Sequence, residues 1–338
     1  MKKNTKKKST KRFLSVSVML GGGFIFLLIL SGIFAPQFSP AHPDSQILEL
    51  RNKPPGFSGK VIYFRHRKNL PVQSVAVESY KRTNEGVRYT DFMGRDFFLP
   101  NEKLEIEWIK SFTFILGSDQ FGRDVLSRII FGARISLAVG ICASTLSMLV
   151  GVFLGGVAGY FGSRIETIIM RITDIMFGFP VLLFLISITA IFEPSLMVVF
   201  IAIGLVTWPG IARLVRGLVL SVKTQEFVLA ARTMGRRSGR VLWRHIFPNC
   251  LSPVIVAYTL GIGSAILAEA SLSFLGLGAQ PPTPSWGSMI NLGKDFIRTA
   301  PWISIAPGVA IALTVLGFNL VGDSLRDYLD PKLKPGLK

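Results

Sequence analysis

Cysteine and histidine are scarce in this 338-residue sequence, and their scarcity excludes two kinds of site. The two cysteines, Cys142 and Cys250, lie in apolar segments without the paired spacing of a disulfide framework or a metal site. We therefore interpret them as small packing residues. The three histidines are scattered along the chain, so no metal centre is expected.

Charge is also scarce, and most of it has one sign. Charged residues make up 17% of the chain against 49% hydrophobic residues, and the mean hydropathy is +0.47, which is typical of a membrane protein. Lysine and arginine number 38 against 20 acidic residues. Because these basic residues mostly flank apolar runs and do not gather on one polar face, nucleic-acid binding is not expected.

Six apolar segments are long enough to cross a bilayer, which takes about 20 residues. Seven basic residues precede the first segment, and the loop 213–244 carries eight basic residues and one acid. Cytoplasmic loops carry an excess of Lys and Arg, so this loop and both termini are predicted to be cytoplasmic. A cleavable signal peptide, the alternative for the first segment, would have a shorter apolar core of about 7–15 residues. The sequence predicts an all-α integral membrane protein with six transmembrane helices, at residues 13–35, 135–162, 165–192, 195–220, 249–272 and 302–321.

Residues 36–116 are polar and are predicted to form an extracytoplasmic insert between the first two spans. Alternating pieces at 60–65 and 73–80 predict short strands. Turn signals at 54–56 and 84–86 favour a small structure of β or α/β content over disorder. The pattern assigns the insert no binding role.

The stretch from Glu226 to Pro248, EFVLAARTMGRRSGRVLWRHIFP, is the most distinctive part of the chain. Arginines at 232, 236, 240 and 244 recur every four residues, and the apolar positions 227, 230, 231 and 234 recur at helical spacing. We predict two short amphipathic helices hinged at Gly235, with Pro248 as the stop. A basic amphipathic loop between membrane spans indicates a cytoplasmic surface that holds a partner.

Small residues in the second span predict close contact between helices. Gly151, Gly155 and Gly159 recur every four residues and are joined on the same face by Gly140 and Ser144. Prolines at 180, 209 and 307 lie inside apolar segments, where they predict kinks or a dedicated gate. We therefore expect a packed bundle with local breaks.

Ionisable residues near the membrane are few, and the sequence suggests roles for Arg171, Asp174 and Glu269. At the start of the third span, Arg171 and Asp174 are expected to pair on one helix face, because they are three residues apart. Glu269 lies in an apolar run, where a carboxylate faces either a bundle interior or an aqueous path. It is the candidate path or gate residue, and the alternatives are structural pairing or an interfacial position.

Motifs that supply energy or catalysis are missing. There is no G-x-x-x-x-G-K-[ST] phosphate loop, no G-x-S-x-G elbow and no G-x-G-x-x-G fingerprint. The spans also lack the rows of Asp, Glu and His that proton relays use. We expect no catalytic residue and no cofactor site in this chain, and transport through it would draw its energy from another subunit.

The basic loop resembles the inner-membrane permease subunits of ABC importers, in the oligopeptide and dipeptide branch. Family permeases carry E-A-A-x3-G-x9-I-x-L-P in the loop before the penultimate span. Leu229 stands where the family usually has glutamate, and that acidic role falls either to Glu226 or to no residue. The positions that match the spacing are Leu229, Ala230, Ala231, Gly235, His245, Phe247 and Pro248.

Three further stretches are similar to the same branch. They are LGSDQFGRDVLSRIIFGARISL at 116–137, AEASLSFLGLGAQPPTPSWGSMI at 268–290, and the segment 300–331 that ends in SLRDYLDP. The insert 36–116 is longer than the usual connection and resembles the long-insert subgroup associated with oligopeptide and microcin C-type uptake. The resemblance therefore covers nearly all of residues 116–331.

This resemblance implies the type I ABC importer permease fold and a bacterial inner-membrane location. The implied partners are a second homologous permease, two ATP-binding cassette subunits that bind the ATP, an extracytoplasmic substrate-binding protein and membrane lipid. The implied domains are 1–35 (basic N-terminus and first span), 36–116 (insert), 117–331 (permease domain with the coupling loop 222–248) and 332–338 (cytoplasmic tail). The residues implied to couple the loop to the ATPase are Glu226, Leu229, Ala230, Ala231, Arg232, Gly235, His245, Phe247 and Pro248.

The implied function is that of a permease subunit that forms half of a translocation path for peptides. Two alternatives stay open on topology alone. The first is a self-sufficient channel or secondary carrier, which would transport without ATPase subunits. The second is a membrane-anchored receptor or structural protein whose insert would bind a ligand or partner in isolation.

Overall fold

The computed structural model describes the backbone of residues 2–65 and 72–329, and the side chains from Val18 onward within those ranges. The predicted tail 332–338 lies outside the described residues. The chain divides into two compact units, which we describe separately. The first comprises Met1–Leu30, Arg134–Gln280 and Ala310–Lys338, and the second comprises Ser31–Ala133 and Pro281–Val309.

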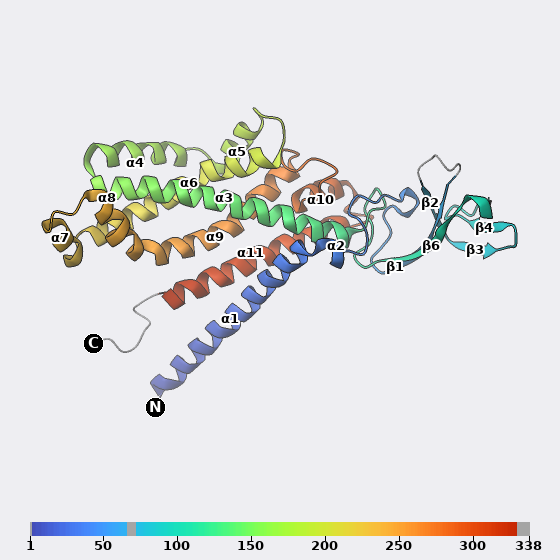
Figure 1. Cartoon of the computed structure of the whole chain (residues 1–338), viewed down its shortest axis with the longest axis horizontal. Coiled ribbons are helices and arrows are strands. Elements are labelled where there is room, and N and C mark those ends of the chain that lie inside the picture. The colour runs from blue at the N-terminus through green and yellow to red at the C-terminus, as the bar shows by residue number, and fades with distance from the viewer. Residues whose placement is uncertain (1, 66–71, 330–338) are drawn as a thin grey trace. The chain divides into compact units, whose positions relative to one another are not determined.

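Helices form most of the first unit (Figure 1). Among the described residues, four helices are long and apolar enough to cross a membrane: α3, α6, α11, and the run from α8 through the π turn η3 into α9. The described apolar part of α1 is the shorter segment Val18–Ile33. The helical bounds are α1 (Lys2–Ile33), α2 (Ala35–Phe38), α3 (Val125–Phe161), α4 (Ser163–Phe177), α5 (Val181–Thr189), α6 (Leu196–Lys223), α7 (Glu226–Thr233), α8 (Ser238–Val241), η3 (Leu242–Ile246), α9 (Phe247–Phe274), α10 (Trp286–Gly293) and α11 (Trp302–Leu329).

Each of the six predicted spans is helical, but the third is not one straight helix. The prediction of a single span over 165–192 was wrong in this respect, because α4 and α5 meet at an angle of 90° (Figure 1). The break falls at Gly178–Pro180, where proline disfavours helical backbone in the residue before it and cannot continue the hydrogen-bond ladder. Pro209, in contrast, lies inside α6, which continues past it.

Contact between the backbones of α3 and α6 holds the bundle together. A β-carbon at Gly155 would lie 2.3 Å from the carbonyl oxygen of Ala212, so only glycine permits this approach. Gly151 and Gly159 meet the backbone of α6 in the same way. Gly140 instead faces Ile266 on α9. The predicted glycine stripe is confirmed as a packing surface, but it contacts two helices in succession.

The described residues of the insert form two antiparallel three-stranded sheets, which confirms its predicted β content. The strands expected at 60–65 and 73–80 are present, although the second divides at Glu78 and its two halves enter different sheets. One sheet has the order β2-β1-β6 and the other β3-β4-β5. The strand bounds are β1 (Phe57–Phe64), β2 (Gln73–Val77), β3 (Ser79–Arg82), β4 (Gly86–Thr90), β5 (Asp96–Pro100) and β6 (Leu104–Phe114).

Apolar residues from both sheets form a common core. Ile62 and Val77 of the first sheet contact Val87 and Leu99 of the second, and each of these side chains is buried. The opposite face of the first sheet covers Leu50, which is also fully buried. The predicted turn at 54–56 has Gly56 with a positive φ of 79°. The insert thus has a packed interior of its own.

The segment between the insert and α3 contains buried ions. Asp119 accepts hydrogen bonds from the backbone of Phe121 and Arg123, and the Nε of Arg123 donates to its second oxygen at 2.6 Å. Nearby, Arg128 donates to the carbonyl of Pro43. Burial raises the pKa of Asp124 above its usual range, although Ser127 donates to its carboxylate. This short loop has few apolar residues, and the ion pair between Asp119 and Arg123 closes its turn.

Replacing Gly155 by alanine is expected to destabilise the bundle. Its methyl group would overlap the backbone of Ala212, and overpacking of this kind costs about 1–3 kcal/mol. Gly156→Ala is the matched control, because no atom lies within 4 Å of the β-carbon position of Gly156. We expect a lower thermal midpoint in detergent for Gly155→Ala alone. Equal midpoints for the two variants would contradict the contact.

Candidate functional site

The helix α7 begins the basic loop (residues 222–248) and has two different sides. Val228 and Ala231 are buried and pack into an apolar cluster with Val219 and Val222 of α6. The side chains of Phe227 and Leu229 are instead 43% and 48% exposed. This division follows from the helical period, which places residues three apart on the same side. Val228 and Ala231 attach α7 to the bundle, and Phe227 and Leu229 present apolar groups on the two flanks of this buried side.

Gly235 allows the chain to turn after α7. Its φ is +72°, in the left-handed region that residues with a β-carbon disfavour. No atom lies within 4 Å of its β-carbon position, so the requirement for glycine comes from the backbone and not from crowding. The predicted hinge position is therefore the point at which α7 ends and the chain reverses towards α8.

The second half of the loop is continuous with the next long helix. The chain runs without a break from Ser238 through η3 into α9, as one helix of 37 residues. The prediction that Pro248 stops a short helix was wrong, because Pro248 lies in the first turn of α9. The π turn ends two residues before this proline, which has no N–H to donate to an α-helical carbonyl.

Two cations attach the loop to the end of α3 at Tyr160. The Nζ of Lys223 donates to the carbonyl oxygen of Tyr160 at 2.5 Å. The guanidinium of Arg232 lies 4.7 Å above the ring of Tyr160, within the range of a cation–π interaction. Tyr160 is 6% exposed and belongs to the same apolar cluster as Val228. We call this contact between Tyr160, Lys223 and Arg232 the Tyr160 clamp.

The predicted loop residues fall into an exposed group and an anchoring group. Arg232, His245 and Phe247 are partly buried, and Ala231 is buried, so these four hold the loop in place. Trp243, at 51% exposed, is an outward apolar residue that the sequence pattern did not single out. The exposed predicted residues are Glu226, Leu229, Ala230, Gly235 and Pro248.

Most of the loop arginines are exposed. Arg236, Arg237, Arg240 and Arg244 are all exposed, and among the described residues none of them forms an ion pair. The basic loop therefore presents exposed positive charge as well as the exposed apolar side chains of α7 and Trp243. Such a surface is suited to an apolar groove with an acidic rim.

Glu269 does not lie with the loop. It is fully buried on α9, roughly 33 Å along the helix from Phe247 at about 1.5 Å per residue. Ser136 of α3 donates to one of its carboxylate oxygens at 3.2 Å, and Ser273 to the other at 2.6 Å. The structure thus gives Glu269 structural partners between α3 and α9, and its assignment to a path or gate stays a prediction.

The carboxylates of α4 pair with α6, not within their own helix. Asp174 accepts from Arg213 at 2.7 Å, and Glu166 accepts from the Nε of Arg216 at 2.6 Å. The predicted pairing of Arg171 with Asp174 was wrong. Local spacing identifies only partners on the same helix, whereas α4 runs beside α6 and meets arginines far along the chain (Figure 1).

The arrangement of helices matches that of a solved transporter. A chain of the MetNI methionine ABC transporter in an inward-facing conformation aligns with a TM-score of 0.50, covering 61% of this chain and 97% of that chain at 16% identity. A second crystal form of that transporter gives a TM-score of 0.51. The fold is therefore the type I ABC importer permease fold.

Two family models match the sequence itself. Residues 151–335 match the binding-protein-dependent transport system inner membrane component. Residues 16–55 match the N-terminal transmembrane domain of oligopeptide transport permease C. The chain belongs to the family of binding-protein-dependent transport system inner membrane components. It is accordingly a permease subunit that works with other ABC transporter subunits at the inner membrane.

Individual relatives are transport permeases, not enzymes. The dipeptide transport system permease protein DppC of Alkalihalophilus pseudofirmus is 51% identical, covering 64% of this chain and 72% of the relative. The glutathione transport system permease protein GsiD of Pectobacterium atrosepticum is 48% identical, covering 65% and 73%. The di/tripeptide permease DppC of Pseudomonas aeruginosa is 46% identical, covering 65% and 73%.

Replacing Tyr160 by leucine is expected to loosen the loop from α3. The substitution removes the aromatic face under Arg232, a contact of about 0.5–2 kcal/mol, whereas Tyr160→Phe keeps it. We expect Tyr160→Leu to raise the ATP hydrolysed per solute transported in the assembled importer, with Tyr160→Phe unchanged.

Phe161→Leu is the control for the Tyr160 clamp, because Phe161 adjoins Tyr160 but is 51% exposed. Thermal midpoints in detergent separate loss of folding from loss of coupling. An unchanged ratio of ATP to solute in a folded Tyr160→Leu variant would rule out the clamp as a coupling contact.

Proposed function

We propose that this chain forms half of the path by which an ATP-driven importer moves peptides across the inner membrane. The observation that carries the proposal is the exposure of Phe227 and Leu229, which flank the buried Val228 on α7, a helix that is fixed to the bundle through Val228 and Ala231. The relatives named above supply the substrate class, since they are named for dipeptides, di/tripeptides and glutathione.

The basic loop is the proposed docking surface for an ATPase subunit. A short amphipathic helix laid into an apolar groove is a recurring mode of recognition. Phe227, Leu229 and Met234 offer apolar side chains that are 43%, 48% and 69% exposed, and the surrounding arginines favour an acidic rim. Leu229 replaces the glutamate usual at its position with an exposed apolar group, so this contact is hydrophobic and Glu226 is the one acid at its edge.

Movement of the ATPase subunits reaches the membrane helices by two routes. The Tyr160 clamp joins α7 to the end of α3, and the continuous helix from Ser238 leads directly into α9. Rocking of packed helices would then open the path alternately to each side. Glu269 lies between the same two helices, α3 and α9, and would feel any shift between them.

The proposed assembly has two homologous permeases, two ATP-binding cassette subunits and one extracytoplasmic substrate-binding protein. ATP is held by the partner subunits. The excess of basic residues in the loop supports a cytoplasmic position for it, and in the proposed topology both termini lie on the same side and the insert on the opposite side. In this assembly the two permeases form the path between them, and lipid surrounds the pair.

Replacing Leu229 by aspartate is expected to weaken docking of the ATPase subunit. The change buries a charge in an apolar contact, and loss of a central contact of this kind lowers affinity by about tenfold or more. We expect less ATPase subunit to co-purify with the permease pair and at least a comparable fall in ATP-driven uptake of a labelled dipeptide. Leu229→Met should retain both.

The matched control is Met93→Asp, which places the same charge on an apolar residue of the insert that is 75% exposed. It should leave co-purification of the ATPase subunit unchanged. Normal co-purification with Leu229→Asp would contradict docking at this side of α7. A loss with Glu226→Ala alone would assign the contact to the acid.

Reconstitution separates the proposed importer from a self-sufficient carrier. Proteoliposomes containing the two permeases without ATPase subunits should take up no labelled dipeptide above empty liposomes. Addition of the ATPase subunits, ATP and the binding protein should produce uptake. Dipeptide uptake by the permeases alone, driven by a solute or ion gradient, would refute the proposal.

A further inference from the structure

Only part of strand β1 of the insert has a neighbouring strand on both of its edges. β6 pairs with it along residues 57–64, whereas β2 pairs with it only from Lys60 to Phe64. The chain leaves the first sheet after Val77 and enters the second at Ser79. In the part of the chain that the structure describes, no strand therefore pairs with the second edge of β1 at residues 57–59. We call this place the β1 gap.

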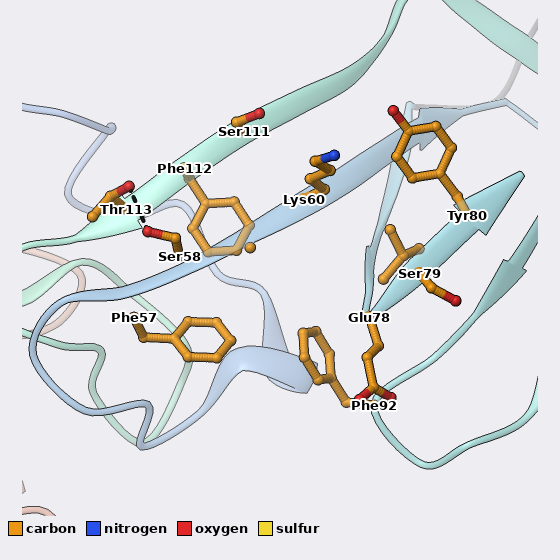
Figure 2. Close-up of a pocket in the computed structure, with 12 residues that line it drawn as sticks. Phe57, Ser58, Lys60, Glu78, Ser79, Tyr80, Phe92, Ser111, Phe112 and Thr113 are labelled. Carbon is orange, nitrogen blue, oxygen red and sulfur yellow. Dashed lines mark hydrogen bonds between the residues drawn. The ribbon is translucent and has the colours of Figure 1, made fainter.

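Aromatic rings line the β1 gap (Figure 2). Phe57, Phe92 and Phe112 surround a cavity of about 650 Å³, together with hydroxyl groups of the two strands. Gly59 makes room for this arrangement, because a β-carbon there would lie 2.7 Å from the ring of Phe112. The ring of Phe112 thus lies across β1 at a position without a side chain of its own.

The walls of the gap are held in place by neighbouring groups. The Nζ of Lys53 lies 4.4 Å from the ring centre of Phe92 and 5.0 Å from that of Phe57, so one cation fixes both rings. The centres of these two rings are 5.9 Å apart. Ser58 and Thr113 are hydrogen-bonded across the strands at 2.9 Å (Figure 2). The apolar surface is preorganised, which lowers the entropy lost on binding.

Glu78 supplies a negative charge at the end of the gap. It directly follows β2, is exposed, and extends beside Phe92 (Figure 2). Among the described residues it forms no ion pair. A chain that continued the direction of β2 along β1 would begin next to Glu78. Its free ammonium group would therefore meet this carboxylate.

We propose that the β1 gap binds a short peptide with a free amino terminus, in extended conformation. The peptide backbone pairs with the edge of β1 at residues 57–59, and an apolar side chain inserts among Phe57, Phe92 and Phe112. Its ammonium group pairs with Glu78. Three residues of strand span about 10 Å, which is the length of a tripeptide. Because strand addition uses mainly backbone hydrogen bonds, the site tolerates many peptide sequences.

This inference rests on the proposed function, which supplies peptides as the transported class. It adds a site that is formed by residues of the insert alone and needs no binding protein. An alternative occupant, an extended segment of a partner protein, would need no free amino terminus. The two occupants are distinguished by blocking the amino group of the peptide.

The test is equilibrium dialysis of tritiated Ala-Phe-Ala against the complete permease and ATPase complex in nanodiscs, without the binding protein. We expect saturable binding that falls by about tenfold in Glu78→Gln, since a charge-assisted hydrogen bond is lost. Phe92→Ala should weaken binding by a similar factor through loss of the aromatic wall. N-acetylated Ala-Phe-Ala should compete poorly.

Glu85→Gln and Phe98→Ala are the matched controls, because both residues lie in the insert outside the β1 gap. Both should bind the tripeptide like the parent chain. Thermal midpoints report folding, and Glu78→Gln changes an exposed side chain without altering its size. Absence of saturable binding in the millimolar range overturns the inference, as does equal binding by the parent, Glu78→Gln and Phe92→Ala.

ATP-driven uptake by the complete importer separates failure of this inference from failure of the proposed function. Peptide uptake without binding at the β1 gap overturns the inference alone. Peptide binding at the gap without uptake of any peptide overturns the proposed function and supports the site. Strong competition by the N-acetylated tripeptide overturns recognition of the amino group and favours a protein segment as the occupant.

Discussion

The close approach of α3 and α6 is the constraint on which the loop end of the bundle depends. Glycines of α3 bring its backbone against that of α6, so their final turns end side by side. Only at this separation can Lys223, the last residue of α6, reach the carbonyl of Tyr160 at the end of α3. The position of α7 is thus a consequence of helix packing inside the apolar bundle.

Arginines on α6 and in the basic loop have different surroundings. Those on α6 pair within the bundle, whereas those in the loop are available to a partner. Arg213 and Arg216 pair with carboxylates of α4, and those ion pairs are partly exposed. Arg236, Arg240 and their neighbours in the loop have no such partner among the described residues. Partly exposed pairs contribute little stability, about 0–1 kcal/mol each, but they neutralise charge close to the bundle. The positive charge that remains is concentrated where a partner can meet it.

Hydropathy was sufficient to place the helices, because about 20 apolar residues are stable in lipid whatever their neighbours. The summed hydropathy of a segment cannot reveal the 90° break at Pro180, because it has the same value whether the helix is straight or bent. Helical spacing likewise identified the amphipathic α7 but not its orientation. Ala231 is buried because it packs in the apolar cluster that contains Val219 and Val228. The partners of Asp174 and Tyr160 were not predictable, since both contacts join residues far apart in sequence.

The absence of a break between Ser238 and Phe274 has a mechanical consequence. Thirty-seven residues at about 1.5 Å each make a rod of roughly 55 Å, longer than the apolar thickness of a bilayer. Tilting one end of a helix this long would displace the other end, by an amount set by the point about which the helix turns. Its arginine-bearing end lies in the basic loop, and the buried Glu269 lies near the opposite end. A force applied at the loop would therefore reach Glu269 along one continuous helix.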